Sequence, residues 1–432
     1  MPDKMDRTQQ PPISELEELD LQKPVRTVLP NGIPLSVINS GEQEVCRIDL
    51  VFEAGQLRQN TLLQALFTNR MLREGTTRYT SAEIASKFDY YGAWLELTCS
   101  MEHAIVTLYT LNRYCRETLS VLHSMVTEPV FPEKEFATVV DMNLQRLQVN
   151  LANVEYLSQR SLLGSLFGES HPYGKFAKEE DYRNLTTEHL KSFYDKYYTS
   201  DNCHIFLAGK ITPAVMDAVT DVMGTKPFGS NKADLTRPCF EIQSAPQKRI
   251  FTEKSDAVQS SLRMGAVTID HNHEDYLKLR VLITLFGGYF GSRLMTNIRE
   301  EKGYTYGISA GLKSYPDTSV LMINSESDNE YVEAVVREVY AEIDRLHTEP
   351  VSEQELTMVK NYMIGEMCRS YESAFALQDG WIFIYVSKLD DDYFRRSLRA
   401  VKEATPQDMA RLAQQYLCKE TLKEVVAGKK MS

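Results

Sequence analysis

Signals that would send the chain to a membrane or to an oxidising compartment are absent from the sequence. No stretch approaches about eighteen consecutive apolar residues, so no membrane-spanning helix is predicted. Residues 1–24 contain no apolar segment of the kind that signal peptides carry. The seven cysteines are scattered, odd in number and form no C-x-x-C pair, which is typical of free thiols in a reducing compartment. These absences predict a cytoplasmic protein that is not inserted in a membrane.

Positive charge is also scarce. The 432 residues include 48 Lys and Arg against 60 Asp and Glu, which gives a formal net charge of −12. Such a surface repels phosphate backbones and anionic lipids, so neither nucleic acid nor a membrane surface is an expected partner. Hydrophobic residues make up 43% of the chain, an ordinary globular composition. The length is enough for two or three domains.

Two segments of the first half return in the second half in the same order. TEPVFPEKEF at residues 127–136 returns as TEPVSEQELT at 348–357. TTEHLKSFYDKYYTSDNCHIFLAGK at 186–210 returns as TPQDMARLAQQYLCKETLKEVVAGK at 405–429. Each member of the longer pair opens like a helix N-cap with an acidic residue in the first turn and closes like a strand that ends at Gly. The repeats predict two related domains.

The same patterns predict an α+β fold, in which each domain has an antiparallel-rich sheet packed with helices, and the two domains enclose a cavity. Strands precede grouped helices in each half, and one long helical run is expected from Arg113 to about Phe167. A proline-containing polar stretch without helical periodicity separates the halves. We divide the chain into an N-terminal extension, a first domain, a linker and a second domain, at residues 1–21, 22–225, 226–246 and 247–432.

A set of short motifs connects this duplicated chain to a known family. In order they are TVLPNGIPLSVI (27–38), FEAG (52–55), EGT (74–76), YYGAWLE (90–96), HPYGKF (171–176) and GGYFGSRLMTNIREEKGYTYGISA (287–310). No single motif is specific, but the ordered set resembles the insulinase-like, or M16, metallopeptidase family of pitrilysin and the mitochondrial processing peptidase. The similarity runs from about residue 22 to the C-terminus.

Active members of that family carry an inverted zinc motif, H-x-x-E-H, on the helix before the Gly-Thr pair, and a later carboxylate completes the site. Here Leu66 and Arg70 occupy the histidine positions, and Asn69 occupies that of the general base. Leu offers no ligand atom, Arg is a permanent cation, and Asn does not accept a proton at neutral pH. The stretch expected to supply the later carboxylate, 142–154, contains no Asp or Glu. The resemblance therefore implies a degenerate zinc site, no metal cofactor and no catalytic residue.

The eight histidines offer no replacement motif of the form H-x-x-E-H or H-E-x-x-H. His271 and His273 flank acidic residues in DHNHED, which is a weak metal signal and is typical of a polar turn between a strand and a helix. His171 in HPYG is interpreted as a turn residue.

One functional pair of the family is retained. Arg299 and Tyr306 in TNIREEKGYTYGIS match an Arg and a Tyr of the second domain that assist substrate binding in active relatives. A guanidinium can donate to peptide carbonyls, and a phenol can steady a developing oxyanion. The alternative interpretation is structural, with Arg299 paired to Glu300, Glu301 or another acid at a helix end and Tyr306 packed within a strand.

Three hypotheses for function follow from the resemblance. The first is a zinc-free subunit, inactive alone, that binds a peptide substrate in its cavity and pairs with an M16-type chain bearing the intact motif, or with a second copy of itself. The second is a non-enzymatic scaffold, as in the related core subunits of the cytochrome bc1 complex. The third is a peptidase that uses an unrecognised site.

Overall fold

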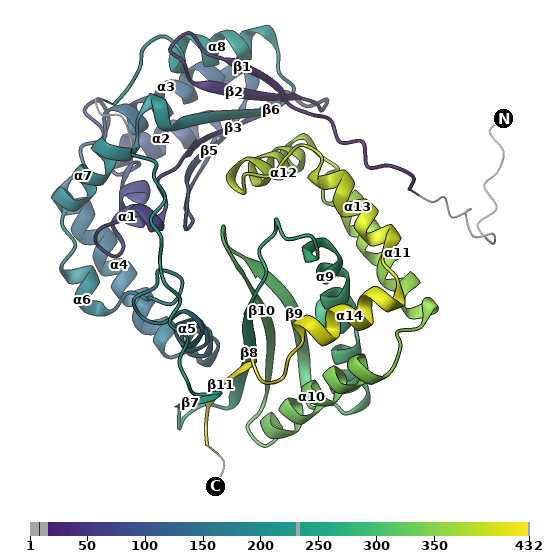
Figure 1. The fold of residues 1–432 in the computed structure, drawn as a ribbon. Helices are drawn as coiled ribbons and strands as arrows, with labels where there is room; N and C mark the ends of the chain where they lie inside the picture. The colour runs from purple at the N-terminus through teal and green to yellow at the C-terminus, as the bar shows by residue number, and fades with distance from the viewer. Residues whose placement is uncertain (1–7, 9–15, 230–233, 431–432) are drawn as a thin grey trace.

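The computed structural model describes residues 8, 16–229 and 234–430, which form two β-sheets with helices packed around them (Figure 1). The first sheet has the strand order β1-β2-β6-β3-β5-β4, and the second has the order β7-β11-β8-β10-β9. The strands of the first sheet are β1 (Val25–Val28), β2 (Pro34–Asn39), β3 (Val45–Phe52), β4 (Trp94–Cys99), β5 (Ala104–Leu111) and β6 (Cys203–Gly209). Those of the second are β7 (Arg249–Glu253), β8 (Gln259–Thr268), β9 (Thr305–Ser314), β10 (Ser319–Asp328) and β11 (Lys423–Gly428).

The two sheets share one topology, which confirms the predicted duplication. In the first half β2 pairs in parallel with β6, and β6, β3, β5 and β4 follow in antiparallel order. In the second half β7 pairs in parallel with β11, and β11, β8, β10 and β9 follow in the same way. Each half is therefore one five-stranded unit, and β1 adds an edge strand to the first.

The helices also correspond between the halves. The first half contains α1 (Gln64–Met71), α2 (Ser81–Tyr91), α3 (Cys115–Thr127), α4 (Glu133–Leu151), α5 (Val154–Phe167), α6 (Glu179–Arg183), α7 (Thr187–Tyr197) and α8 (Pro213–Met223). The second contains α9 (Tyr276–Ile283), α10 (Val332–Thr348), α11 (Glu353–Arg369), α12 (Ala374–Val386), α13 (Tyr393–Glu403) and α14 (Pro406–Tyr416). The repeated TEPV segments join α3 to α4 and α10 to α11, so the repeat marks equivalent helix–helix corners.

Local chemistry sets several helix boundaries. Thr186 and Thr405 cap α7 and α14 as expected, because each hydroxyl accepts the backbone N–H three residues on. The single helical run predicted over 113–167 is wrong, since the structure has three helices there. Pro132 lies at the start of α4, where its missing N–H costs nothing, and the Asn153 side chain caps α5.

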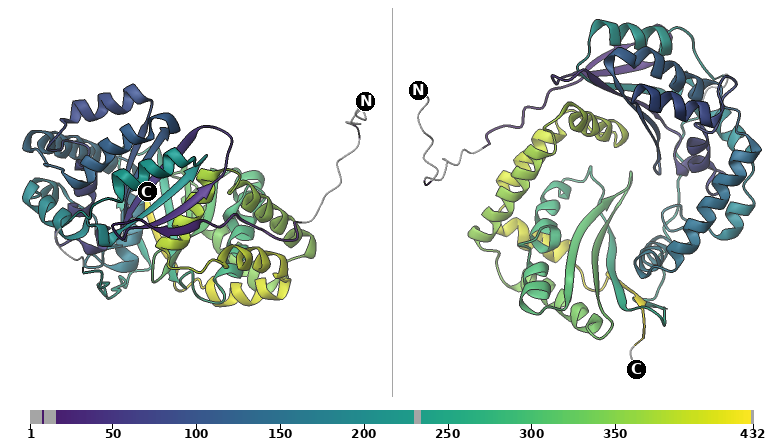
Figure 2. Two further views of the ribbon diagram at one scale, coloured as in Figure 1. Left: turned by 90° about the horizontal axis from the view of Figure 1, so that it is seen from above. Right: turned by 180° about the vertical axis from the view of Figure 1, so that it is seen from behind.

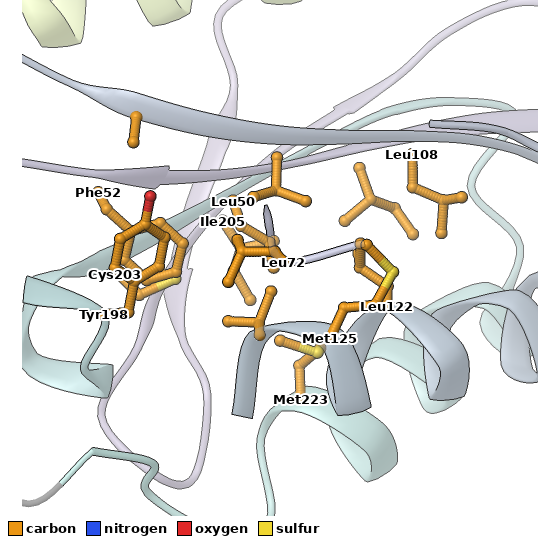
Figure 3. Packing of buried hydrophobic residues seen from close by; sticks show 14 of the residues in the cluster. Leu50, Phe52, Leu72, Leu108, Leu122, Met125, Tyr198, Cys203, Ile205 and Met223 are labelled. Carbon is orange, nitrogen blue, oxygen red and sulfur yellow. The ribbon is translucent and has the colours of Figure 1, made fainter. Parts of the chain in front are cut away.

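Each half has its own apolar core between its sheet and the helices on one face. Figure 3 shows part of the first core, in which residues from β3, β5 and β6 meet residues from the surrounding helices. Leu50, Leu108 and Leu122 are fully buried there. The second core is built in the same way, with Met264, Ile323 and Val339 at its centre.

The other face of each sheet is covered by a helix from the opposite half. Helix α5 packs on β8 and β11 of the second sheet, and α12 packs on β2 and β6 of the first (Figures 1 and 2). The two helices stand at equivalent places in the duplicated sequence, one turn after α4 and α11 respectively. The halves therefore exchange one helix each, and this exchange holds them together.

Two further segments tie the halves. In the N-terminal segment the carbonyl of Gln22 accepts the indole N–H of Trp381 at 2.9 Å, and the carbonyl of Leu16 accepts the Lys402 ammonium at 3.1 Å. Between α8 and β7 the described residues form no helix or strand, yet the backbone N–H of Ala245 donates to Ser165 of α5 at 2.8 Å. None of the described helices is both long and apolar enough to cross a membrane.

Candidate functional site

The degenerate zinc positions lie on α1, a short helix that packs under the first sheet. Leu66 is half-buried and packs against the first core. Asn69 is fully buried, and its amide joins two other elements. Its Nδ2 donates to the Thr98 carbonyl on β4 at 2.7 Å, and its Oδ1 accepts the Tyr198 hydroxyl at 3.1 Å. Asn69 thus holds α1 in place and has no free group to offer.

Arg70 reaches across to α4. Its guanidinium donates to the Oδ1 of Asn143, so Asn143 is the residue of α4 that faces the former metal position. Burial and the nearby charge of Arg146 lower the pKa of Arg70 from its usual value. Asn143 lies within the 142–154 stretch where a third ligand was expected, and its side chain is an amide, not a carboxylate.

These residues do not fit a zinc ion. Leu66 has no donor atom, the Asn69 amide is already engaged on both sides, and Arg70 places a cation where a dication would stand. Across the described ranges, no three His, Cys, Asp or Glu side chains come together in a way that could hold a metal. No catalytic step is derived through zinc on this chain.

A polar groove of about 400 Å³ lies between α5 and the second sheet. Its floor is the face of β8, β9 and β10 that points away from the second core. Tyr306 stands at its rim, on the edge strand β9, and is 86% exposed. The register between β9 and β10 shifts at this point, so that Tyr306 is an extra residue without a partner across the ladder. Such a bulge re-aims one side chain, and here it presents the phenol to the groove.

The bulge is fixed by Thr305. Its buried hydroxyl donates to the Glu326 carbonyl on β10 at 2.5 Å and accepts the Gly307 N–H at 3.0 Å. Ser325 donates to the same hydroxyl at 3.1 Å. The position of Tyr306 therefore follows from a local hydrogen-bond network.

Arg263 on β8 is the central charge of this groove. Its guanidinium donates to Asn324 on β10 at 2.5 Å and pairs with Glu155 of α5 at 2.7 Å. Its Nε donates to Ser158 of α5 at 3.3 Å, and the Ser158 hydroxyl also lies 2.9 Å from that of Ser261. This polar set joins the exchanged helix α5 to the second sheet, and all of its members except the buried Ser158 line the groove beside Tyr306.

Arg299 lies on a π-helical segment, Met295–Glu301, that follows a second π-helical segment, Thr284–Gly288. Its guanidinium stands over the exposed ring of Phe290, with the guanidinium carbon 4.8 Å from the ring centroid. In the described part of the chain it pairs with no carboxylate, so the pairing with Glu300 or Glu301 in the structural interpretation is not observed. Arg299 is not among the residues that line the groove of Tyr306.

The glycines before Arg299 have a packing role. A β-carbon on Gly287 would lie 2.6 Å from that of Ala310 on β9, closer than real side chains approach. The π-helical segment Thr284–Gly288 therefore packs directly against β9, the strand that carries Tyr306. Segments of this helix type occur often at functional sites.

The histidines singled out in the sequence have structural roles. His171 is buried in the turn after α5, where its Nδ1 accepts the backbone N–H of Tyr173 at 3.1 Å and its ring stacks on Phe167. His271 reaches the Ser387 carbonyl at 3.1 Å, and His273 accepts the backbone N–H of Asp275. DHNHED is a turn between β8 and α9, as expected, but the expectation of solvated histidines there is wrong for His271, which is buried.

Sequence reasoning missed Arg263 and Asn143. The signal for Arg263 was a lone cation inside the apolar strand SSLRMGAV. A buried cation in a strand needs a counter-charge, and the partner of Arg263 is Glu155 on α5, the helix from the other half. Asn143 carries no comparable signal, because only the packing of α4 against α1 reveals that it faces Arg70.

Comparison with known proteins agrees with these observations. A family model for insulinase, peptidase family M16, matches residues 36–168, and a model for the peptidase M16 inactive domain matches residues 184–363. Together they account for more than half of the chain, which belongs to the insulinase-like M16 family.

Individual relatives are distant and carry contrasting names. A Rickettsia felis protein named as an uncharacterized zinc protease is 25% identical over 350 residues, covering 80% of this chain and 83% of its own length. The Bacillus subtilis uncharacterized zinc protease YmxG is 23% identical over 346 residues, covering 79% of this chain and 83% of its own length. A Helicobacter pylori protein named non-peptidase homolog YmxG is 24% identical over 254 residues, covering 58% of this chain and 57% of its own.

Solved structures show the same fold. A peptidase M16 inactive domain from Pseudomonas fluorescens superposes with a TM-score of 0.83 at 24% identity, covering 96% of this chain and 99% of the other. A Helicobacter pylori protease superposes with a TM-score of 0.85 at 16% identity, covering 95% and 100%. The chain therefore has the fold of M16 peptidase-like proteins.

Proposed function

We propose that the chain is the zinc-free, substrate-binding subunit of a two-chain M16 peptidase. In this assignment a partner chain with an intact H-x-x-E-H helix supplies the metal and the base. This chain supplies the second-domain face that holds an extended peptide, with Tyr306 and Arg299 nearest the chemistry. It is inactive alone.

The observation that carries the proposal is the contrast between the two predicted sites. Two of the positions that would bind or activate zinc have structural roles here: Asn69 donates a hydrogen bond to β4, and Arg70 donates one to α4. Tyr306, in contrast, is held by a bulge with its ring in solvent. An 86% exposed tyrosine at the rim of a polar groove gains nothing from packing, which favours a role in binding.

The geometry of the second sheet suits a peptide. Strand β9 is an edge strand, so the backbone groups on its outer side are available to an added strand. Gly307, Ser309 and Gly311 lie on the face of β9 opposite the core, and two of them lack side chains that would obstruct an approaching chain. Sequence preference would come from the few side chains around the groove, Arg263 and Asn324 first among them.

We place the assembly in the cytoplasm, a compartment that suits seven free cysteines. A pair of identical chains would contain no metal site, so the partner must be a different M16-type chain for cleavage to occur.

The test is reconstitution with an M16-type chain that bears the intact motif. Wild-type protein should form a complex with that chain and raise its cleavage of a quenched fluorescent peptide. Arg299→Ala should reduce cleavage more than tenfold, since a charge-assisted hydrogen bond is worth about 1.5–3 kcal/mol. Tyr306→Phe should lower kcat more than it raises KM, because the hydroxyl acts as charge develops.

Two variants serve as controls. Arg337→Ala removes an exposed guanidinium on α10, and Tyr90→Phe removes an exposed phenol hydroxyl on α2; both should leave cleavage unchanged. If the complex forms but cleaves equally well with Arg299→Ala and Tyr306→Phe, the proposal is wrong. Complex formation without any gain in cleavage would favour the scaffold hypothesis.

A further inference from the structure

A separate cavity of about 290 Å³ lies in the second half, remote from the groove of Tyr306. It is bounded by α9, α12, α13 and the ends of α11 and β9, and Leu19 of the N-terminal segment forms part of its wall. Its volume is at the lower end of the range for small-molecule sites, roughly 300–1,000 Å³.

The cavity contains a guanidinium without a counter-ion. Arg280 on α9 is half-buried; its Nη1 makes a long hydrogen bond, 3.4 Å, to the hydroxyl of Ser397 on α13, and its guanidinium also donates to the Tyr393 phenol. Among the residues described, no carboxylate lies within ion-pair distance of it. The buried Arg263 and the half-buried Arg293 each face a glutamate, at 2.7 and 2.8 Å respectively. A guanidinium offers five N–H donors, so most of those on Arg280 are unused.

Phenol hydroxyls surround the same guanidinium. Tyr371 and Tyr393 lie close enough to Arg280 to sense its charge, and burial raises the pKa of both phenols above the usual value. They stay protonated and can donate. Tyr276 shares a 2.6 Å hydrogen bond with Ser314, and in the described chain the Tyr371 hydroxyl has no hydrogen-bond partner. The cavity is therefore rich in hydrogen-bond donors, and none of the described residues that line it is an anion that could accept from them.

The remaining wall is apolar. Met367, Phe383 and Phe394 line the cavity together with Leu19 and Leu312. Phe394 packs edge-on to Tyr371 with ring centroids 5.0 Å apart, so the wall is built from interlocked rings. Arg280 is the one charged residue among the described residues that line it. One cation and several hydroxyls beside a wall of apolar side chains match a monoanion with an apolar body, whereas a phosphate ester would require more positive charge.

We propose that this cavity binds a small carboxylate with an apolar body, held by a bidentate contact to Arg280 and by the hydroxyls of Tyr371 and Tyr393. Two sources share this chemistry, a free aromatic or aliphatic acid and the C-terminal residue of a peptide. The site is independent of the groove of Tyr306 and does not require a partner chain.

The test uses matched probes and an internal reporter. The chain has two tryptophans, and the buried Trp381 lies 5.6 Å from Phe394 between ring centroids, so Trp94→Phe leaves a single reporter beside the cavity. Phenylacetate and N-acetylphenylalanine should each change Trp381 fluorescence saturably. Phenylacetamide and N-acetylphenylalanine amide have the same shape without the charge and should not. Binding of phenylacetate alone identifies a free acid as the ligand, and tighter binding of N-acetylphenylalanine identifies a peptide terminus.

Variants locate the binding. Arg280→Gln should weaken the probe at least tenfold, because it removes the only charge in the site. Arg399→Gln changes an exposed arginine on α13 and should bind like wild type. If Arg280→Gln melts early, Tyr371→Phe tests the same contact with a smaller change and should weaken binding severalfold.

A second measurement does not depend on variants. In a spectrum of methionine methyl groups, the probe should shift the signal of Met367 and leave that of Met142, exposed on α4 of the other half, in place. The proposal is overturned if neither carboxylate binds below about 10 mM, where affinity is under roughly 3 kcal/mol. It is equally overturned if the amides bind as well as the acids, or if Met367 does not respond.

Discussion

At the scale of single residues, α1 shows how a position that is catalytic in active M16 peptidases can serve the fold instead. Asn69 takes the place of the general base, and its amide satisfies a carbonyl of β4 and the hydroxyl of Tyr198 inside the core. An amide does both at once because it donates and accepts, whereas a carboxylate only accepts. The substitution thus removes the base and stabilises the fold with the same atoms.

Asn69→Ala should lower the free energy of unfolding by about 1–3 kcal/mol, because it leaves the hydroxyl of the buried Tyr198 without its partner and removes the hydrogen bond to the Thr98 carbonyl of β4. Urea unfolding followed by circular dichroism measures this. Gln148→Ala, at an exposed position of α4, is the matched control and should change stability by less than about 0.5 kcal/mol. Equal effects of the two substitutions would show that the Asn69 amide has no structural role.

Much of this was predictable from the residues themselves, and some was not. The missing ligand atoms at Leu66, Asn69 and Arg70 follow from side-chain chemistry, so the sequence alone predicts that zinc does not fit. That Asn143 faces Arg70 depends on the angle between α1 and α4, which no local pattern encodes. The Tyr306 bulge is equally hidden, because strand propensity does not reveal a register shift.

At the scale of secondary-structure elements, the exchanged helices α5 and α12 form equivalent junctions with different chemistry. Asp49 pairs across from Phe206, and Arg263 pairs across from Val425; both partner residues stand two positions before the shared Ala-Gly. Asp49 and Arg263 are therefore equivalent positions of the duplicated sheets. The first accepts from Gln378 of α12, and the second donates to Ser158 of α5.

The α12 junction can be tested by its buried ion pair. Arg47 lies between the fully buried Asp49, at 2.8 Å, and Asp379 of α12, at 2.7 Å, whose side chain is 63% exposed. Asp49→Ala should cost about 3–5 kcal/mol, because it leaves the Gln378 amide without its acceptor and the buried Arg47 guanidinium with only the water-exposed Asp379 as a counter-charge. Asp379→Ala should cost less than about 1 kcal/mol, since its contact is screened by water. A reversed order in chemical denaturation would contradict this account of the junction.

The element scale also marks the limit of sequence interpretation. Repeated corners and caps, such as Thr186 and Thr405, predict the duplication because helix starts have local signatures. The exchange of α5 and α12 has no such signature, because the sequence of an apolar helix face does not indicate which of the two sheets the helix covers. The prediction of one helix over 113–167 failed for a different reason, because it gave no weight to the local boundary signals Pro132 and Asn153.

At the scale of the whole molecule, acid should loosen the contact between the halves. Two histidines of the first half pack near Tyr385 of α12: His103, between β4 and β5, and His204, on β6. Burial lowers the pKa of each imidazole to about 4. An unfolded histidine has a pKa near 6.5, so between about pH 4 and 6.5 the unfolded chain binds more protons. Stability contributed by the neutral rings is present above pH 6.5 and is lost as the pH falls.

Lowering the pH from 7 to 5 should therefore reduce the free energy of unfolding by about 3 kcal/mol through these two groups. Thermal or urea unfolding across this range measures the slope. A His103→Gln, His204→Gln variant lacks both titrating rings and should show a correspondingly flatter profile. An unchanged slope in that variant would mean that other groups govern the acid sensitivity.

The central claim, that residues 66–70 and 142–154 do not form the zinc site of active M16 peptidases, is tested most directly by elemental analysis of the purified chain after equilibration with zinc and removal of the excess. The account predicts zinc far below one ion per chain and no peptide hydrolysis that a chelator abolishes. About one tightly held zinc per chain, lost when residues 66–70 are altered, would contradict it.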